Sequence, residues 1–364
     1  MSINEIIVYI MVIFAALGAL DRIIGNRFGL GEKFEEGIIS IGALSLSMVG
    51  IIALAPVIAN VLKPVVVPLF GFLGADPAMF AGSILANDMG GATLAKALAA
   101  DEQMGAFGGL IIGAMLGATV VFTIPVGLGI IKDSDRGYFA TGVLAGVITI
   151  PIGAFVGGLV AGFPILTVLR NLIPIIIFAV LIALGLWKFQ KGMIIGFTWF
   201  GRFIVAVITF GLILGIIEQL TGIVIIKGMN PISEGFEIVA DIAIVLAGAF
   251  PLVYVITKVF RTPLMKLGKL LGMNDVAAAG MVASLANSIP MFDMMKDMDN
   301  RGKILNVAFA VSAAFVFGDH LGFTAGFNSE MILPMIVGKL VGGITAVCVA
   351  IFIANKTLGK ERVK

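Results

Sequence analysis

The chain has 364 residues, of which 60% are hydrophobic and only 13% are charged, and its formal net charge is +2. Charged residues supply about a quarter of an ordinary water-soluble domain, so this composition excludes a soluble globular protein and indicates an integral membrane protein. The single cysteine, Cys348, excludes an intrachain disulfide and a metal site built from a cysteine cluster. The small net charge gives no reason to expect a nucleic-acid partner.

Apolar stretches follow one another along the chain, and a run of about 20 apolar residues is enough to cross a bilayer. The first stretch is expected to be a membrane helix rather than a cleavable signal, because no basic residue precedes it. The sequence predicts nine membrane helices, near residues 6–20, 38–62, 104–131, 138–163, 165–187, 193–217, 236–257, 304–327 and 331–354.

Two further apolar segments, 77–100 and 276–300, are each interrupted near the middle. The first is broken at Asn87-Asp88-Met89-Gly90-Gly91 and the second at Asn287-Ser288-Ile289-Pro290. Each half has about ten residues, or about 15 Å as a helix, which is half of the hydrocarbon thickness. A broken helix is tolerated in a membrane where the freed backbone lies in protein or in a wet cavity. We therefore predict two re-entrant hairpins, with eleven full spans as the alternative.

The distribution of lysine and arginine favours the hairpins. These residues concentrate in cytoplasmic loops, and with two hairpins and an outside N-terminus most of them fall on one side. If both segments crossed the membrane, the basic residues between 258 and 269 would instead lie outside.

The two broken segments also resemble each other, since Leu85-Ala86-Asn87 recurs as Leu285-Ala286-Asn287. The register extends to either side, and an odd number of predicted crossings separates the copies, so the repeats are expected to be inverted. The predicted division is 1–33 for a first membrane helix and loop, 34–163 for repeat 1, 164–235 for connecting membrane helices, 236–354 for repeat 2 and 355–364 for a basic cytoplasmic tail.

Inverted repeats with helices broken at the midplane form the substrate site in many secondary transporters. The breaks carry Asn87 and Asp88 in one copy and Asn287 and Ser288 in the other. Asp88 is the only formal charge among them, which favours a cationic or amine-bearing solute. The alternative is that these residues only cap the half-helices, a role in which Asn, Asp and Ser are common.

A second polar cluster, Asp319-His320, lies inside an apolar span. An ionisable group in a membrane segment is a functional hypothesis by default, as a solute contact or a proton relay. His320 is the only histidine, and its ordinary titration range is physiological. The alternative is that Asp319 and His320 pair with each other and only hold helices together. The repeat register also matches Thr123 with Thr324, and both are candidate solute contacts.

No common enzyme signature is present: the sequence contains no His-Glu-x-x-His, no P-loop and no Gly-x-Ser-x-Gly. We therefore expect a protein that is not an enzyme, that needs no cofactor or metal, and that is not driven by ATP.

Several longer motifs carry a resemblance to a known family. They include Phe34-Glu35-Glu36-Gly37, Asp88-Met89-Gly90-Gly91, Ser134-Asp135-Arg136 and the run 142–153. On these residues the chain resembles the ethanolamine permeases of bacterial ethanolamine-utilisation operons, the EutH family. The resemblance implies a multi-pass protein of the bacterial cytoplasmic membrane that moves ethanolamine. It also leads us to expect a cysteine where this chain has Asn87, which makes Asp88 the stronger candidate of the two.

The expected function is facilitated diffusion of protonated ethanolamine. Two alternatives stay open at this stage: a proton-coupled or channel-like carrier of another small polar solute, and a non-transporting membrane scaffold. The polar loops are short and offer little surface for binding a partner protein, which argues against a scaffold. The partners expected are ethanolamine and the lipid bilayer, and flat glycine-rich helix faces make a homodimer a further expectation.

Overall fold

The computed structural model describes residues 2–361, apart from the side chains at 260, 261, 264, 357 and 359–361. All regular structure in this range is helical. The helices are α1 (Ile3–Ile23), α2 (Leu30–Phe72), α3 (Ala78–Ile84), η1 (Asn87–Met89), α4 (Gly91–Leu98), α5 (Glu102–Ala106), η2 (Phe107–Gly117), η3 (Thr119–Thr123), α6 (Ile124–Ile130), η4 (Asp133–Asp135), α7 (Arg136–Val147), α8 (Ile150–Val160), α9 (Ile165–Lys188), α10 (Gln190–Thr221), α11 (Ile232–Leu270), α12 (Asp275–Ser284), α13 (Ser288–Met294), η5 (Met295–Asp297), α14 (Asn300–Ala313), α15 (Asp319–Phe327), η6 (Ser329–Met331) and α16 (Ile332–Glu361).

Within the described residues 2–361, eight helical stretches are long and apolar enough to cross a membrane. They are Ile3–Ile23, Leu30–Phe72, Glu102–Ile130, Asp133–Val160, Ile165–Lys188, Gln190–Thr221, Ile232–Val259 and Ser329–Lys356. The prediction of an all-α polytopic membrane protein is confirmed.

The ninth expected span, 304–327, is not continuous. Helix α14 ends at Ala313 and α15 begins at Asp319. Between them the backbone pairs with the break after α12: Phe315 N–H donates to the Ser284 carbonyl at 3.0 Å, and Phe317 N–H to the Leu285 carbonyl at 2.9 Å. These two bonds satisfy backbone groups that a buried helix end would otherwise leave unpaired.

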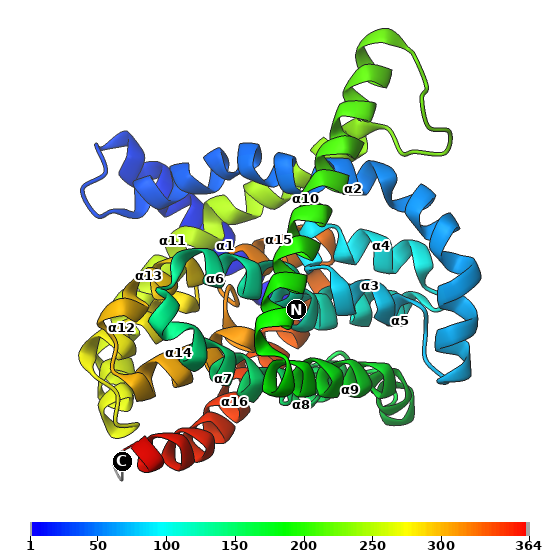
Figure 1. Cartoon of the computed structure of the whole chain (residues 1–364). Coiled ribbons are helices and arrows are strands. Elements are labelled where there is room, and N and C mark those ends of the chain that lie inside the picture. The colour runs from blue at the N-terminus through cyan, green and yellow to red at the C-terminus, as the bar shows by residue number, and fades with distance from the viewer. Residues whose placement is uncertain (1, 362–364) are drawn as a thin grey trace.

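Both segments predicted as hairpins consist of short helices that fold back on each other, α3 on α4 and α12 on α13. The two pairs come from opposite sides of the molecule, as Figure 1 shows with α3 and α4 on the right and α12 and α13 on the left. The arrangement brings the two breaks toward the middle of the fold.

Matching aspartates close the outer ends of the two hairpins. The Asp76 carboxylate accepts hydrogen bonds from the N–H groups of Ala100 and Asp101, both at 3.0 Å. At the other hairpin the Asp299 carboxylate accepts from the N–H groups of Asn274, at 2.8 Å, and Gly302, at 3.2 Å. Each hairpin is thus tied across its open end by one carboxylate.

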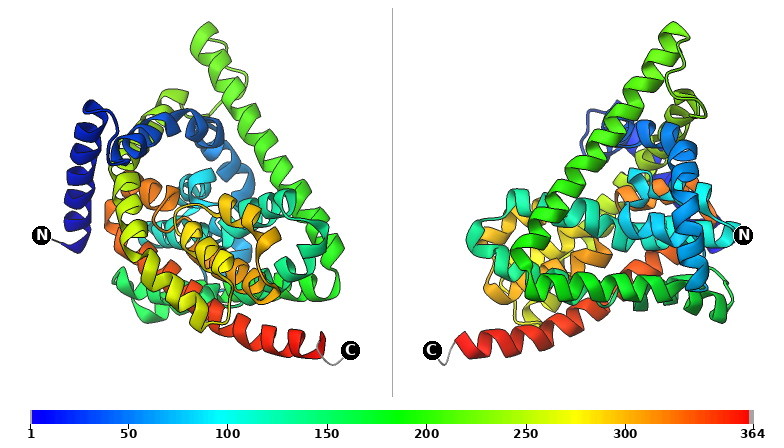
Figure 2. Two further views of the ribbon diagram at one scale, coloured as in Figure 1. Left: turned by 90° about the vertical axis from the view of Figure 1, so that its left-hand side faces the viewer. Right: turned by 45° about the vertical axis from the view of Figure 1, so that its right-hand side comes forward.

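The long helices α2 and α11 pack along each other. At the edges, α1 lies on α11 and α10 lies on α2, and Figure 2 shows α1 and α10 on opposite flanks. Both contacts depend on glycine: a Cβ on Gly50 would stand 1.8 Å from the Ile208 carbonyl oxygen, and one on Gly248 would stand 2.2 Å from that of Met11. Small residues permit this close approach in membranes.

The predicted division into repeats stays a prediction, which these matched contacts support. Helix α16 continues to Glu361, so the beginning of the expected tail 355–364 is helical. The residues of the tail after Glu361 lie outside the described range.

Candidate functional site

The centre of the molecule contains a fully buried lysine. Lys339 on α16 is 1% exposed and donates a hydrogen bond to the carbonyl of Ala114. Ala114 belongs to η2, a π-helix whose bonding pattern is wider than that of an α-helix, and such segments are frequent at functional sites. A buried ammonium is costly unless it is hydrogen-bonded and paired with a charge, so its surroundings matter.

The negative partner in this region is Asp88. Its Oδ1 lies 3.9 Å from Nε2 of His320, and its side chain is 18% exposed while that of His320 is only 4% exposed. Lys339 lies close enough to both Asp88 and His320 for its charge to act on them. Asp88, His320 and Lys339 form what we call the central cluster.

The backbone explains how these residues meet. Asp88 lies in η1, which is followed by Gly90, where a φ of 87° requires the left-handed conformation that glycine adopts easily. The η1 turn rests on η2, since a Cβ on Gly113 would be 3.2 Å from the Asn87 nitrogen. His320 lies in the first turn of α15, directly after the irregular segment 314–318 that separates α14 from α15.

The irregular segment 314–318 contains a residue with a strained backbone. Phe315 has a φ of 62°, in a region that aromatic residues rarely adopt. Its ring lies 5.3 Å from that of His320 and 5.3 Å from that of Phe122, measured between centroids. Backbone strain of this kind persists only where the surroundings hold it and is concentrated at functional sites.

Several buried polar atoms near the breaks have no hydrogen-bond partner within the part of the chain that the structure describes. They include both amide atoms of Asn87, Nδ1 of His320 and the hydroxyls of Ser288, Ser312 and Thr324. Buried polar atoms are almost always hydrogen-bonded, so each exception needs an explanation such as an ordered water or a ligand. Four of the eight residues predicted from sequence are in this set.

Asp319 does not join the central cluster. It lines a separate cavity of about 210 Å³ with Asn287, Glu36, Lys33 and Tyr254, which we call the acidic cavity. Asp319 experiences the negative charges of both Asp88 and Glu36. Within the cavity Lys33 pairs with Glu36 at 2.5 Å. The carboxylate that meets His320 is therefore Asp88, and the alternative of an Asp319–His320 lock does not describe the structure.

The other predicted site residues are placed as follows. Asn287 uses its side-chain oxygen to cap the Ile289 N–H at 2.8 Å, which agrees with the capping alternative for this residue. Ser288 begins α13 and Thr123 ends η3, and both are buried. Among residues 2–361 neither forms a side-chain hydrogen bond to the central cluster.

Sequence reasoning missed two residues, Lys339 and Glu36. The signal for Lys339 was present, because it is the only charged residue in the predicted span 331–354 and the rule that flagged Asp319 and His320 applies to it equally. Glu36 carried no such signal, since it lies beside Glu35 near the start of a long helix.

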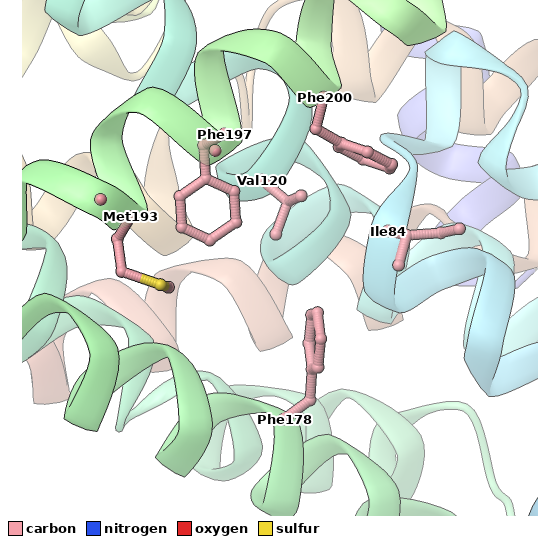
Figure 3. Close-up of a pocket in the computed structure, with 8 residues that line it drawn as sticks. Ile84, Val120, Phe178, Met193, Phe197 and Phe200 are labelled. Carbon is pink, nitrogen blue, oxygen red and sulfur yellow. The ribbon is translucent and has the colours of Figure 1, made fainter. Parts of the chain in front are cut away.

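A larger cavity of about 280 Å³ is apolar. Figure 3 shows the side chains of Phe178, Met193, Phe197 and Phe200 around Ile84 and Val120. These side chains offer hydrocarbon and one sulfur, so the cavity does not suit a small charged solute. Within residues 2–361 no group of three His, Cys, Asp or Glu side chains is placed to hold a metal ion.

A polytopic helical protein with two broken hairpins and charged groups buried between them has the features of a membrane transport protein. The comparisons with known proteins agree. Residues 3–353 match the family described as ethanolamine utilisation protein EutH. The chain belongs to the EutH family.

Similar curated proteins cover the whole chain. A protein of Listeria monocytogenes called "Probable ethanolamine permease EutH" is 66% identical over all of this chain and 98% of its own length. One of the same name from Escherichia coli is 50% identical over 98% of this chain and 97% of its own. The "Uncharacterized protein YxeR" of Bacillus subtilis is 48% identical over 100% and 98%. No solved structure matches this chain. With these relatives and its apolar helices, the protein is a multi-pass protein of a bacterial membrane.

Proposed function

We propose that this protein moves ethanolamine across the cytoplasmic membrane by facilitated diffusion of the protonated amine. The relatives named as probable ethanolamine permeases support the choice of solute. The observation that carries the proposal for the site is the partly exposed Asp88 next to the buried Asn87 amide, whose nitrogen and oxygen have no hydrogen-bond partner among the residues that the structure describes.

Protonated ethanolamine has an ammonium and a hydroxyl, so it needs a carboxylate and a group that both donates and accepts. Asp88 supplies the carboxylate, and the Asn87 amide supplies a donor with its nitrogen and an acceptor with its oxygen. A charge-assisted hydrogen bond between ammonium and carboxylate is roughly twice as strong as a neutral one. The acidic cavity, with Asp319 and Glu36, adds negative potential that attracts a cation.

The experiment is uptake of radiolabelled ethanolamine by proteoliposomes that contain the purified protein, without ATP. An acidic external pH keeps most of the solute protonated, so that leakage of the neutral amine through lipid is small. We expect saturable uptake that follows the ethanolamine gradient and exceeds that of empty liposomes. Folded protein that gives no more uptake than empty liposomes would refute the proposal.

A second candidate is proton-coupled uptake, which the contact between Asp88 and His320 favours because it places two titratable groups 3.9 Å apart. The same proteoliposomes distinguish the two mechanisms. A proton gradient imposed without an ethanolamine gradient drives accumulation only in the coupled case, and a proton ionophore then abolishes it.

A further inference from the structure

The central cluster contains a resident counter-ion for the carboxylate assigned to the solute. Lys339 is held by the Ala114 carbonyl, next to Gly113, and Gly113 contacts the backbone of Asn87. Asp88 follows Asn87 directly in η1, and η1 packs on η2, which holds the Lys339 ammonium through Ala114. An ammonium is therefore already close to Asp88 when no solute is bound.

The position of Lys339 is also fixed. It lies on α16 beside Gly338, and the Gly338 Cα would be only 3.3 Å from a Cβ on Gly157 of α8. One turn further along α16, the Gly342 carbonyl accepts a hydrogen bond from Thr149 at 3.2 Å. Backbones this close leave α16 little freedom to move away from α8, so the Lys339 side chain stays at the cluster.

We infer that Lys339 is a tethered substitute for the solute ammonium, which neutralises Asp88 in the empty carrier and competes with ethanolamine for it. The inference rests on the proposed function. With a neutral imidazole on His320, the empty cluster has no net charge, and the loaded cluster has one positive charge. The empty carrier can then return without an isolated carboxylate in a low-dielectric interior, which would be strongly unfavourable.

Removal of the Lys339 charge should affect net uptake and exchange of ethanolamine differently. In Lys339→Gln, Asp88 has no competitor, so ethanolamine binds more tightly. Exchange of labelled for unlabelled ethanolamine uses only the loaded carrier and should continue. Net uptake requires the empty carrier to return with Asp88 unpaired, and it should slow.

The test measures net uptake and exchange in the same proteoliposomes for wild type and Lys339→Gln. In the variant we expect the half-saturating ethanolamine concentration to fall severalfold and the maximal net rate to fall at least about tenfold, a change that the loss of a single interaction can produce. The maximal exchange rate should change by less than about twofold. If net uptake and exchange change in equal proportion, or neither changes, the inference is wrong.

The matched control is another buried lysine with an aspartate partner. Lys303 is 8% exposed and pairs with Asp135 at 2.7 Å, outside the central cluster. The double variant Asp135→Asn/Lys303→Gln removes this pair without leaving an isolated charge. Its ratio of net uptake to exchange should equal that of wild type, and a shifted ratio in the control would overturn the assignment to Lys339.

Thermal unfolding in detergent keeps the inference testable if Lys339→Gln folds poorly. Asp88→Asn and Lys339→Gln are measured singly and together. If the two charges neutralise each other, the double variant is more stable than Lys339→Gln alone, whereas strictly additive shifts would refute the pairing. Failure of wild type to transport would instead count against the proposed function, so the two failures are distinguishable.

Discussion

Gly318 lies against the carbonyl oxygen of Ala286, so closely that a Cβ on Gly318 would stand 2.0 Å from it. The first half of the chain has the same relationship, with 1.8 Å between a Cβ on Gly117 and the Leu85 carbonyl oxygen. Gly117 and Gly318 are separated by the same 201 positions as Thr123 and Thr324, so they are equivalent in the predicted repeat. At both breaks, therefore, a glycine without a side chain lets one backbone contact the unwound part of a hairpin.

Gly318→Ala should destabilise the protein by about 3 kcal/mol, because overpacking typically costs about 1–3 kcal/mol and a Cβ 2.0 Å from a backbone oxygen is a severe case. Thermal unfolding in detergent measures the effect. The control is Gly42→Ala on α2, where a Cβ would meet no atom within 4 Å. Alanine should there be neutral or slightly stabilising, since it is the better helix former. Equal effects at both sites would show that the contact at Gly318 relaxes easily.

Asp88→Asn should reduce the ratio of maximal rate to half-saturating concentration by about ten- to a hundredfold, because a hydrogen bond to a charged group contributes about 1.5–3 kcal/mol. Uptake of labelled ethanolamine at several concentrations measures it. Asp293→Asn is the control, since Asp293 forms an exposed ion pair with Lys296 at 3.1 Å, and such pairs contribute little. Wild-type transport by Asp88→Asn would remove Asp88 from the site and leave the carrier proposal standing.

The sequence predicts the helical hairpins well because their determinants are local. At the first break a carboxylate and an amide lie beside two glycines, and at the second an amide lies close to a proline. Each half of either segment is only about half as long as a membrane span, so these local features favour a break. The break at 314–318 has no such local cause. It depends on hydrogen bonds from Phe315 and Phe317 to the backbone at the end of α12. Because the sequence does not reveal these long-range bonds, it predicts the apolar run 304–327 as one continuous helix.

The site could be predicted only as separate parts. Asp88 and His320 are each conspicuous in sequence, but the 3.9 Å contact between them joins positions far apart in the chain. Proximity in sequence suggested Asp319 as the partner of His320. Consecutive residues on a helix point about 100° apart, and this rotation sends Asp319 to the acidic cavity and His320 to Asp88. Lys339 shows the converse case, a residue with a clear signal whose partner is a backbone carbonyl that no side-chain pattern reveals.

The buried pair of Lys303 and Asp135 should be a stability determinant. Lys303→Gln leaves the Asp135 carboxylate buried and unpaired, and loss of one partner of a buried pair costs about 3–5 kcal/mol. We expect a clear fall in the unfolding temperature, partly recovered when Asp135→Asn is added. Lys296→Gln, which removes an exposed partner of Asp293, should change little. If the double variant is no more stable than Lys303→Gln alone, the two charges do not depend on each other.

The charges of the acidic cavity should change the affinity for protonated ethanolamine, but transport should not require them. Glu36→Gln and Asp319→Asn each remove a negative charge from its lining, so each should raise the half-saturating concentration of ethanolamine by about two- to fivefold, the range of a partly solvated charge interaction. Lys33→Gln removes a positive charge from the same lining and should shift it in the opposite direction. All three shifts should shrink at high salt, which screens solvent-accessible charges. Uptake at low and high ionic strength measures them, and a Lys33→Gln shift in the same direction as Glu36→Gln would show that the cavity acts through local structure and not through its charge.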